Sequence, residues 1–516
     1  MIMQLRPYQK ECIEAVEHAG NGRWLCQLAT GMGKTVIFAN IPRHGNTLIL
    51  SHRQELVMQP LRYFDCETAV EMGTSSGNHL GKAIAPVTSA SVQTLCKRFG
   101  NYDRDAFHTI IVDEAHHAAS ESYRRILDYF LPRRLLGFTA TPNRADGKGL
   151  ECVFDKIIFQ KDLRWGIENG YLSPIHCKRV NIGYDLRGVS TKMGDYSPKD
   201  LDRVVNVASC NRAIAEVVRQ IADLPCLIFA VDVEHAEAIA KEIPGAVALS
   251  AQSKDRAEVI AAYKKGEVKV LVNCALFTEG TDLPNTRTVI IARPTKSVGL
   301  YTQMVGRGTR LSAGKDHCLL IDCIGVSDMP LCTAPSLLGL DLDGVPRRYQ
   351  DDIEGDLLED LPAMIEAKAD TPESWVNNVK IVDLWAKASG YTLHDVNWQK
   401  KSDGTLFVSL PGKKMLKVSA PDLTGKVVLS TAAGYSREFD NAQDAYDLAF
   451  TLLRSKCAEQ RPLWSLSSAK RWGSAPASEK QIQFITRLAM RKKIDVSGVL
   501  PGITKLQATN LLSRLK

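Results

Sequence analysis

The chain has 516 residues, of which 45% are hydrophobic and 24% are charged, as in ordinary globular proteins. No run approaches the roughly 18 apolar residues of a membrane span, and the N-terminus lacks the apolar core of a signal peptide. Thirteen cysteines without a CxxC pair favour reduced thiols over a zinc cluster or a disulfide framework. We therefore expect a cytoplasmic protein of about three domains that contacts no membrane.

The net charge of +7 is distributed unevenly along the chain. Residues 461–516 hold eleven Lys or Arg against two acids, a net +9, whereas residues 351–370 hold eight acids and one lysine. The basic excess is therefore C-terminal, and phosphate polymers are its natural partners. A solvated basic helix face is the alternative interpretation.

Short apolar runs alternate with helical stretches through the first two thirds of the chain. In chain order they are residues 47–52, 109–117, 134–142, 226–231, 245–250, 268–273, 288–294 and 318–325. Runs of this length between helices predict buried parallel strands in α/β sheets. The gap in the series predicts two sheets of similar kind, in residues 1–160 and 206–345, separated by a mixed segment, residues 161–205.

The pattern changes after an acidic linker, which we place at residues 346–375. Strand-like runs with turn residues, and a helix with Asn441 as its N-cap, predict a small α+β domain in residues 376–460. Residues 461–516 predict a basic helical tail module. Within it, residues 478–516 predict two or three short helices, the first of which begins at a Ser478 cap.

The stretch ATGMGKT, residues 29–35, follows an apolar run and precedes a helical stretch. A glycine-rich turn lets backbone N–H groups approach phosphate oxygens, and the following helix N-terminus adds positive charge. Leu28 stands where the full phosphate-loop pattern has its first glycine. The side chain of Lys34 would reach the β- and γ-phosphates, and the Thr35 hydroxyl would bind Mg²⁺. We expect nucleotide contacts from Thr30, Gly31, Gly33, Lys34 and Thr35.

A second motif supplies the acids that such a loop lacks. The run IIVDEAHH, residues 110–117, ends an apolar strand in two carboxylates. We expect Asp113 to hold Mg²⁺ and Glu114 to orient and deprotonate an attacking water. The two motifs together predict hydrolysis of ATP with Mg²⁺ as cofactor.

Two arginines, Arg307 and Arg310, lie in the stretch TQMVGRGTR of the second predicted sheet region. That region has no phosphate loop of its own. If the two sheets face each other, both arginines can reach the γ-phosphate bound by the first and neutralise charge during transfer. Hydrolysis would then depend on closure of the two lobes.

These motifs, in this order over residues 1 to about 345, resemble the superfamily 2 helicases. The resemblance implies two tandem RecA-like lobes of parallel sheet, followed here by the small α+β region and the basic helical module. It implies adenine recognition by Gln9, supported by Arg6, and places Gly280 and Asp282 at the nucleotide, with Gln303 opening the arginine motif. It implies that nucleic acid is bound by His52, Arg53, Gln93, Thr94 and Thr278. It also implies coupling between the sites through His116, Thr139 and Thr141.

Within the superfamily, the stretches RPYQ, SHRQEL, GYLSP and RPTKSVGLYTQMVGRGTRL resemble the DNA-directed RadD/XPB/UvsW type of bacteria and phages. The RadD type carries a cysteine-rich zinc module after the second lobe, and this chain has none. The resemblance implies a DNA helicase or translocase of replication, recombination or repair, in a bacterial cell or a phage-infected host. Single-stranded, duplex or branched DNA is the expected partner, and a protein partner at the C-terminal third is open.

Three other functions stay open on the sequence. The chain could be an RNA helicase, although its motifs favour DNA. It could be a nucleic-acid-dependent ATPase switch without unwinding activity, which only a strand-separation assay would distinguish. It could also be the motor subunit of a nuclease system, in which case a partner would cut, since no separate nuclease signature occurs in the chain.

Overall fold

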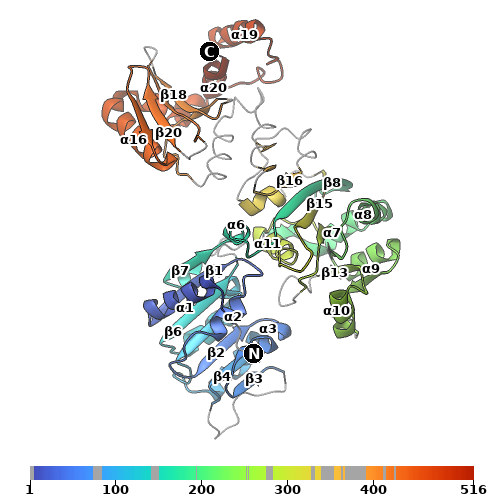
Figure 1. The fold of residues 1–516 in the computed structure, drawn as a ribbon. Coiled ribbons are helices and arrows are strands. Elements are labelled where there is room, and N and C mark those ends of the chain that lie inside the picture. The colour runs from blue at the N-terminus through green and yellow to red at the C-terminus, as the bar shows by residue number, and fades with distance from the viewer. Residues whose placement is uncertain are drawn as a thin grey trace. The chain divides into compact units, whose positions relative to one another are not determined.

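The computed structural model describes residues 5–73, 84–140, 150–192, 194–250, 253, 255–274, 283–326, 332–338, 354–358, 360–361, 364–365, 391–401, 403–410, 414–422 and 426–515. The chain divides into two compact units, Met1–Leu337 and Leu338–Lys516. Figure 1 shows the first unit in blue to yellow and the second in orange to red. None of the helices in these ranges has the length and apolar character needed to cross a membrane.

The first unit begins with an α/β lobe whose sheet is parallel throughout. In spatial order its strands are β3 (Thr68–Glu71), β4 (Val87–Ser91), β2 (Thr47–Ser51), β5 (Thr109–Asp113), β6 (Arg134–Thr139), β1 (Gly22–Leu28) and β7 (Lys156–Lys161). The helices of this lobe are α1 (Pro7–Ala19), α2 (Lys34–Ala39), α3 (Gln54–Met58), α4 (Val92–Arg98), α5 (Glu121–Tyr129) and α6 (Leu163–Glu168). Strands β2, β4, β5 and β6 are buried along their whole length, which explains their continuous apolar or small-residue runs.

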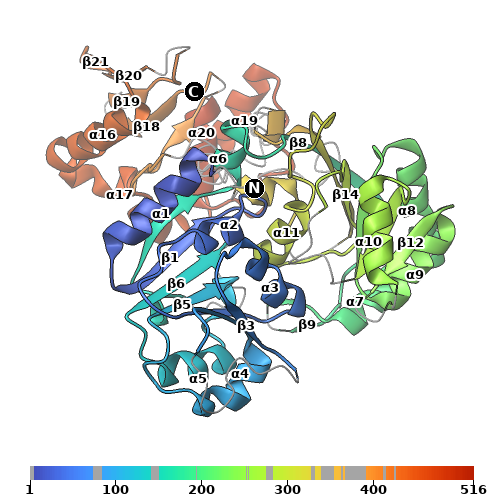
Figure 2. The same cartoon turned by 60° about the horizontal axis from the view of Figure 1, so that its bottom comes forward.

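Helices cover both faces of this sheet. Helix α1 packs against β1 and β7, and α4 packs against α5 (Figures 1 and 2). The core under α4 and α5 includes Leu95, Ile126 and Phe130, all at most 1% exposed. Because every strand runs in the same direction, the loops after β1, β2, β5 and β6 meet at one edge of the sheet, where α/β proteins bind their ligands.

The second lobe of this unit is also a parallel sheet. Its strands within the unit are, in spatial order, β12 (Ala246–Leu249), β13 (Val270–Cys274), β11 (Cys226–Ala230), β14 (Thr288–Ile291), β15 (Cys318–Val326) and β8 (Ile175–Asp185). Its helices are α7 (Pro198–Val205), α8 (Ala208–Gln220), α9 (Val233–Glu242), α10 (Arg256–Lys265) and α11 (Val298–Val305), and β9 (Thr191–Lys192) pairs with β10 (Asp195–Tyr196). Helix α9 packs on β12 and β13 and contacts α8 (Figure 2). The predicted pair of RecA-like parallel sheets is confirmed.

Strand β8 comes from the segment that the sequence places between the lobes, residues 161–205. It pairs with β15 as a full strand of the second sheet. Its burial alternates along much of its length, so only one face is covered. The continuous apolar run that marks the other strands is therefore absent from its sequence.

The second unit contains an antiparallel sheet and several helices. The strands are β17 (Gln399–Lys400), β18 (Leu406–Leu410), β19 (Lys414–Val418), β20 (Val427–Thr431) and β21 (Ser436–Phe439). The helices with described bounds are α16 (Ala442–Lys456), α17 (Arg461–Trp464), α18 (Leu466–Gly473), α19 (Glu479–Lys492) and α20 (Lys505–Leu515). The predicted caps are confirmed, because the side chains of Asn441 and Ser478 accept hydrogen bonds from the backbone N–H groups of Asp444 and Gln481.

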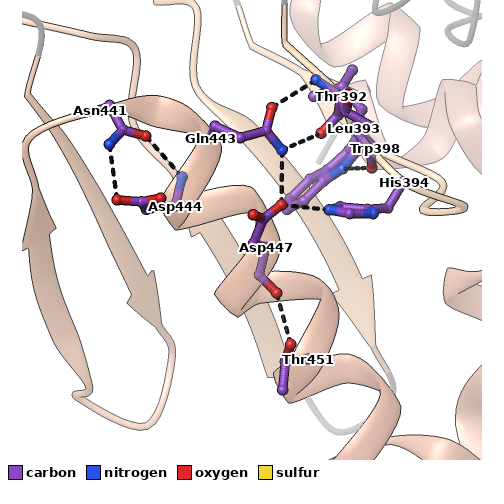
Figure 3. Close-up of polar contacts among 9 residues, drawn as sticks. All are labelled: Thr392, Leu393, His394, Trp398, Asn441, Gln443, Asp444, Asp447 and Thr451. Carbon is purple, nitrogen blue, oxygen red and sulfur yellow. Dashed lines mark hydrogen bonds and ion pairs between the residues drawn. The ribbon is translucent and has the colours of Figure 1, made fainter.

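Helix α16 is tied to the segment that precedes the sheet (Figure 3). The carboxylate of Asp447 accepts hydrogen bonds from Gln443 Nε2 and His394 Nε2, both at 2.7 Å. Gln443 also accepts a hydrogen bond from the backbone N–H of Thr392. The His394 ring stacks on Phe450 at 4.6 Å. These contacts hold the segment that precedes the sheet against α16. This structural role explains the cluster of polar side chains without a catalytic role.

Candidate functional site

A pocket of about 310 Å³ lies at the carboxyl edge of the first sheet and is lined by both lobes of the first unit. The expected site residues that line it are Arg6, Thr30, Gly31, Gly33, Lys34, Thr35, Asp113, Glu114, Arg307 and Arg310. These residues come from four separate stretches of the sequence. The structure therefore brings most of the predicted site together.

The phosphate loop connects β1 to α2. Gly31 and Gly33 have φ of +92° and +73°, a left-handed conformation that favours glycine. Gly33 is the N-cap of α2, so Lys34 begins the helix. A Cβ on Gly33 would lie 2.7 Å from Gln9 Nε2, so a larger residue there would displace the Gln9 side chain and strain the backbone.

The two acids of the site follow β5. Asp113 is 3% exposed, and one of its oxygens accepts a hydrogen bond from the Glu114 backbone N–H at 3.0 Å. Glu114 itself is held at φ +49°, which is uncommon for a residue with a side chain. Its Oε1 lies 3.6 Å from Lys34 Nζ. Its Oε2 is buried, and within the described chain its contact is His116 Nδ1 at 3.4 Å, longer than a good hydrogen bond.

The second lobe contributes two arginines that follow α11. Arg307 is 3% exposed and Arg310 is partly buried, and both line the pocket. A Cβ on Gly306 would lie 2.5 Å from Thr30 Cβ, so a glycine is needed where the second lobe meets the phosphate loop. The backbone after α11 is fixed from two directions. Lys315 Nζ donates to the carbonyls of residues 308 and 310, and the Ser173 backbone N–H donates to the carbonyl of residue 309 at 2.7 Å.

Lys315 was not singled out by the sequence, yet it positions the arginines. It is 9% exposed, and burial lowers its pKa from the ordinary lysine value. Two accepting carbonyls compensate for that loss of hydration. Nothing in its sequence context distinguishes it from a surface lysine.

Three histidines form a chain of ring contacts beside the site. The rings of His116 and His117 are 4.1 Å apart, and those of His117 and His52 are 4.2 Å apart. His116 Nδ1 lies 3.2 Å from Thr139 Oγ1, and its Nε2 lies 3.4 Å from Gln303 Nε2 of the second lobe. A neutral His116 with its proton on Nδ1 satisfies both contacts, because its Nε2 then accepts from the Gln303 amide.

The expected nucleic-acid residues of the first lobe lie near the ends of β2 and β4. Gln93 Nε2 donates to the carbonyl of His52 at 2.9 Å, which connects the two elements. Thr94 Oγ1 accepts from the Gly73 backbone N–H at 3.1 Å. Arg53 immediately precedes α3 and is partly exposed. Their contact with nucleic acid stays a prediction.

Gln9 lies against the phosphate loop and is not among the residues that line the pocket. Its Oε1 accepts from the Arg6 backbone N–H at 3.0 Å, and its Nε2 lies 3.4 Å from the Met32 carbonyl. Arg6 lines the pocket together with Tyr171, and its guanidinium lies 5.6 Å from the centre of the Tyr171 ring. Tyr171 stacks on Trp165. Sequence reasoning missed Tyr171 as a site residue, and an aromatic residue lining a nucleotide pocket is suited to pack against a base.

Four of the expected residues lie outside the described residues: Thr141, Thr278, Gly280 and Asp282. Their roles stay predictions.

Oxygen donors suited to Mg²⁺ are present in the pocket. Asp113 and Thr35 both line it, next to Lys34. Within the described ranges, no group of three His, Cys, Asp or Glu side chains is arranged to hold a metal ion. Mg²⁺ in nucleotide sites is held by one or two protein oxygens, phosphates and water, so this donor set fits Mg²⁺ together with a nucleotide.

The fold and the site define a two-lobed ATPase of the phosphate-loop class. Two family models match the same lobes. Residues 2–144 match the type III restriction enzyme res subunit, and residues 211–312 match the helicase conserved C-terminal domain. The two lobes of the first unit thus match, one after the other, the two halves of a superfamily 2 helicase motor, whose members hydrolyse ATP.

Several curated proteins are similar to this chain. A candidate ATP-dependent helicase of Saccharomyces cerevisiae, IRC3, is 36% identical over 70% of this chain and 56% of its own length. The DNA 3′–5′ translocase XPB2 of Sulfurisphaera tokodaii is 26% identical over 64% of this chain and 84% of its own. The endonuclease subunit of the type I restriction enzyme EcoAI of Escherichia coli is 25% identical over 72% of this chain and 52% of its own. The chain thus spans little more than half of the yeast and restriction proteins.

Proposed function

We propose that the chain is an ATP-dependent DNA helicase or translocase, in which closure of two lobes over ATP drives movement on DNA. The observation that carries the proposal is one pocket lined by Lys34 and Glu114 of the first lobe and by Arg307 and Arg310 of the second. This is the arrangement that phosphoryl transfer requires, with a cation on the phosphates, a base for water and arginines for the transition-state charge.

The mechanism follows from the positions of these side chains. Lys34 and the N–H groups of the loop bind the phosphates, and Thr35 with Asp113 would hold Mg²⁺, which neutralises phosphate charge when bound. The buried Oε2 of Glu114 accepts a proton from the attacking water. Arg307 and Arg310 neutralise the charge that develops on the γ-phosphate, and both reach it only from the second lobe. Hydrolysis therefore requires the lobes to be closed.

Nucleic acid would act through the first-lobe residues at the ends of β2 and β4. His52 contacts the ring of His117, and His117 contacts His116, whose other partners include Glu114, Thr139 and Gln303. We assign to this chain of contacts the coupling between nucleic-acid binding and the ATP site.

The choice of DNA over RNA is supported by relatives whose names specify DNA, such as the XPB2 translocase. The RadD/XPB/UvsW assignment, a role in replication, recombination or repair, and a cytoplasmic location in bacteria or phage-infected cells are part of the same proposal. A nuclease-system motor is the second candidate, since the EcoAI subunit is similar over much of this chain. A cleavage assay with supercoiled DNA distinguishes it.

Steady-state ATP hydrolysis tests the proposal, measured alone and with single-stranded, duplex and forked DNA and with RNA. We expect stimulation by DNA that Arg310→Ala abolishes, together with strand displacement or translocation on the stimulating form. Stimulation by RNA alone would make the chain an RNA helicase. Stimulation without strand separation or movement would make it a nucleic-acid-dependent switch, and equal activity with every polymer would refute a nucleic-acid motor.

A further inference from the structure

The C-terminal helices form a small module with its own core. Residues Ile485, Ala489, Ala508 and Leu511 are at most 2% exposed and join α19 to α20. A capping box at Ser478 begins α19. This packing fixes one face of α19 inward and leaves the opposite face in solvent.

The solvent face of α19 carries one stripe of three cations and an aromatic ring. Lys480, Phe484, Arg487 and Arg491 are all exposed, Phe484 by 39%. Their spacing of four, three and four residues places them within about 60° around the helix axis, along about 16 Å of its length. We name these four residues the α19 stripe.

We propose that the α19 stripe is a docking surface for single-stranded nucleic acid. The inference rests on the proposed function, because a protein that moves along nucleic acid gains from a second contact with it. The charge and the chemistry of the stripe itself support the proposal.

Charge selects a polyanion. Residues 478–515 contain seven Lys or Arg and two acids, Glu479 and Asp495. Asp495 accepts a hydrogen bond from the Ser497 backbone N–H, and Glu479 lies roughly 100° around the helix from Lys480. Among the described residues, no ion pair neutralises Lys480, Arg487 or Arg491. A row of unneutralised cations of this kind attracts a phosphate backbone.

The aromatic ring selects a single strand. In a duplex the bases are stacked inside, so that a ring among the cations would meet only phosphates and sugars. A single strand offers base faces, and an exposed ring between Lys480 and Arg487 can stack on one while these cations hold adjacent phosphates. A carboxylate-rich protein would use the cations but would gain nothing specific from Phe484.

Binding by the full chain without nucleotide tests the proposal, measured by fluorescence anisotropy with labelled dT₂₀ and with a 20-base-pair duplex. Phe484→Ala should weaken binding to dT₂₀ by about tenfold and leave duplex binding unchanged, and Phe484→Trp should restore it. Arg487→Gln should lower the slope of log affinity against log salt for dT₂₀ by about 0.7. Lys492→Gln, an equal charge change elsewhere on the same helix, is the matched control.

Several results would overturn the inference. Wild-type affinity of Phe484→Ala for dT₂₀ would remove the stacking role. Equal effects of Arg487→Gln and Lys492→Gln would reduce the stripe to general basic charge, and equal losses on duplex and single strand would reject the single-strand assignment. The binding assay contains no ATP, so a failure of the proposed ATPase activity does not affect it. If DNA stimulates hydrolysis normally but the stripe variants bind dT₂₀ as tightly as the wild type, only the inference about the stripe is rejected.

Discussion

Replacing Glu114 by glutamine tests the chemistry of the site most directly. Glutamine keeps the volume of the side chain and its place beside Lys34 Nζ, which lies 3.6 Å from Oε1 in the wild type. It removes the negative charge and the ability to accept a proton. Because Glu114 has a backbone φ of +49°, a larger change of residue would confuse loss of chemistry with backbone rearrangement.

The size of the effect follows from the role. Positioned general bases contribute about 10²- to 10⁴-fold to rate, which corresponds to about 3–5 kcal/mol of activation free energy. ATP binding should be retained or slightly strengthened, since a carboxylate beside the triphosphate is replaced by a neutral amide. We therefore expect the whole loss in kcat and none in nucleotide affinity.

Single-turnover hydrolysis at saturating DNA, together with equilibrium binding of a fluorescent ATP analogue, separates these two quantities. Glu121→Gln, an exposed change in the first turn of α5, controls for the charge of the lobe. A Glu114→Gln turnover within about threefold of the wild type would refute the assignment of the base.

Three other substitutions probe closure and stability. Gly306→Ala would bring a methyl group 2.5 Å from Thr30 Cβ across the lobe contact, so kcat should fall by about 10- to 100-fold at an unchanged Tm. Gly308→Ala instead meets Cys318 Sγ inside the second lobe, and it should cost about 1–3 kcal/mol in thermal unfolding. The pKa of Asp322 is raised to about 6 by burial. Above the pKa of the unfolded chain, and up to about pH 6, the folded chain therefore keeps a proton on Asp322 that the unfolded chain has lost. Its contribution to the free energy of unfolding should therefore fall between about pH 4 and 6, and the difference from Asp322→Asn, measured by urea unfolding, should change by on the order of 3 kcal/mol over that range. A pH-independent difference would contradict this.

Most of the motor could be predicted from its strands, because buried parallel strands leave continuous apolar runs in the sequence. Residues 109–113 and 226–230 are examples, each buried along its full length. Strand β8 escaped prediction because its alternating burial produces no such run. The phosphate loop and the two acids were predictable because phosphate binding calls for a glycine-rich turn before a helix, and binding of Mg²⁺ and water calls for carboxylates at a strand end.

Residues whose role arises only from tertiary contact could not be predicted. Tyr171 follows α6 and reaches the pocket because the chain returns there before entering β8. Lys315 resembles a surface lysine until the backbone carbonyls of residues 308 and 310 are placed around it. Gln9 carries a recognisable motif, yet its amide is engaged by Arg6 and the Met32 carbonyl. Adenine contact by Gln9 would require at least one of these interactions to be exchanged.

Under the proposed function, the contact between His116 and Gln303 connects the two arginines with the histidine to which we assign coupling. Gln303 lies on α11, and Arg307 and Arg310 follow directly after that helix. A movement that brings the arginines to the pocket therefore also brings Gln303 to His116. His116 is in turn 4.1 Å from His117, which contacts His52 at the proposed nucleic-acid element. A movement of His52, at the proposed nucleic-acid-binding residues, can thus be transmitted to the contact between the lobes through the rings of His52, His117 and His116.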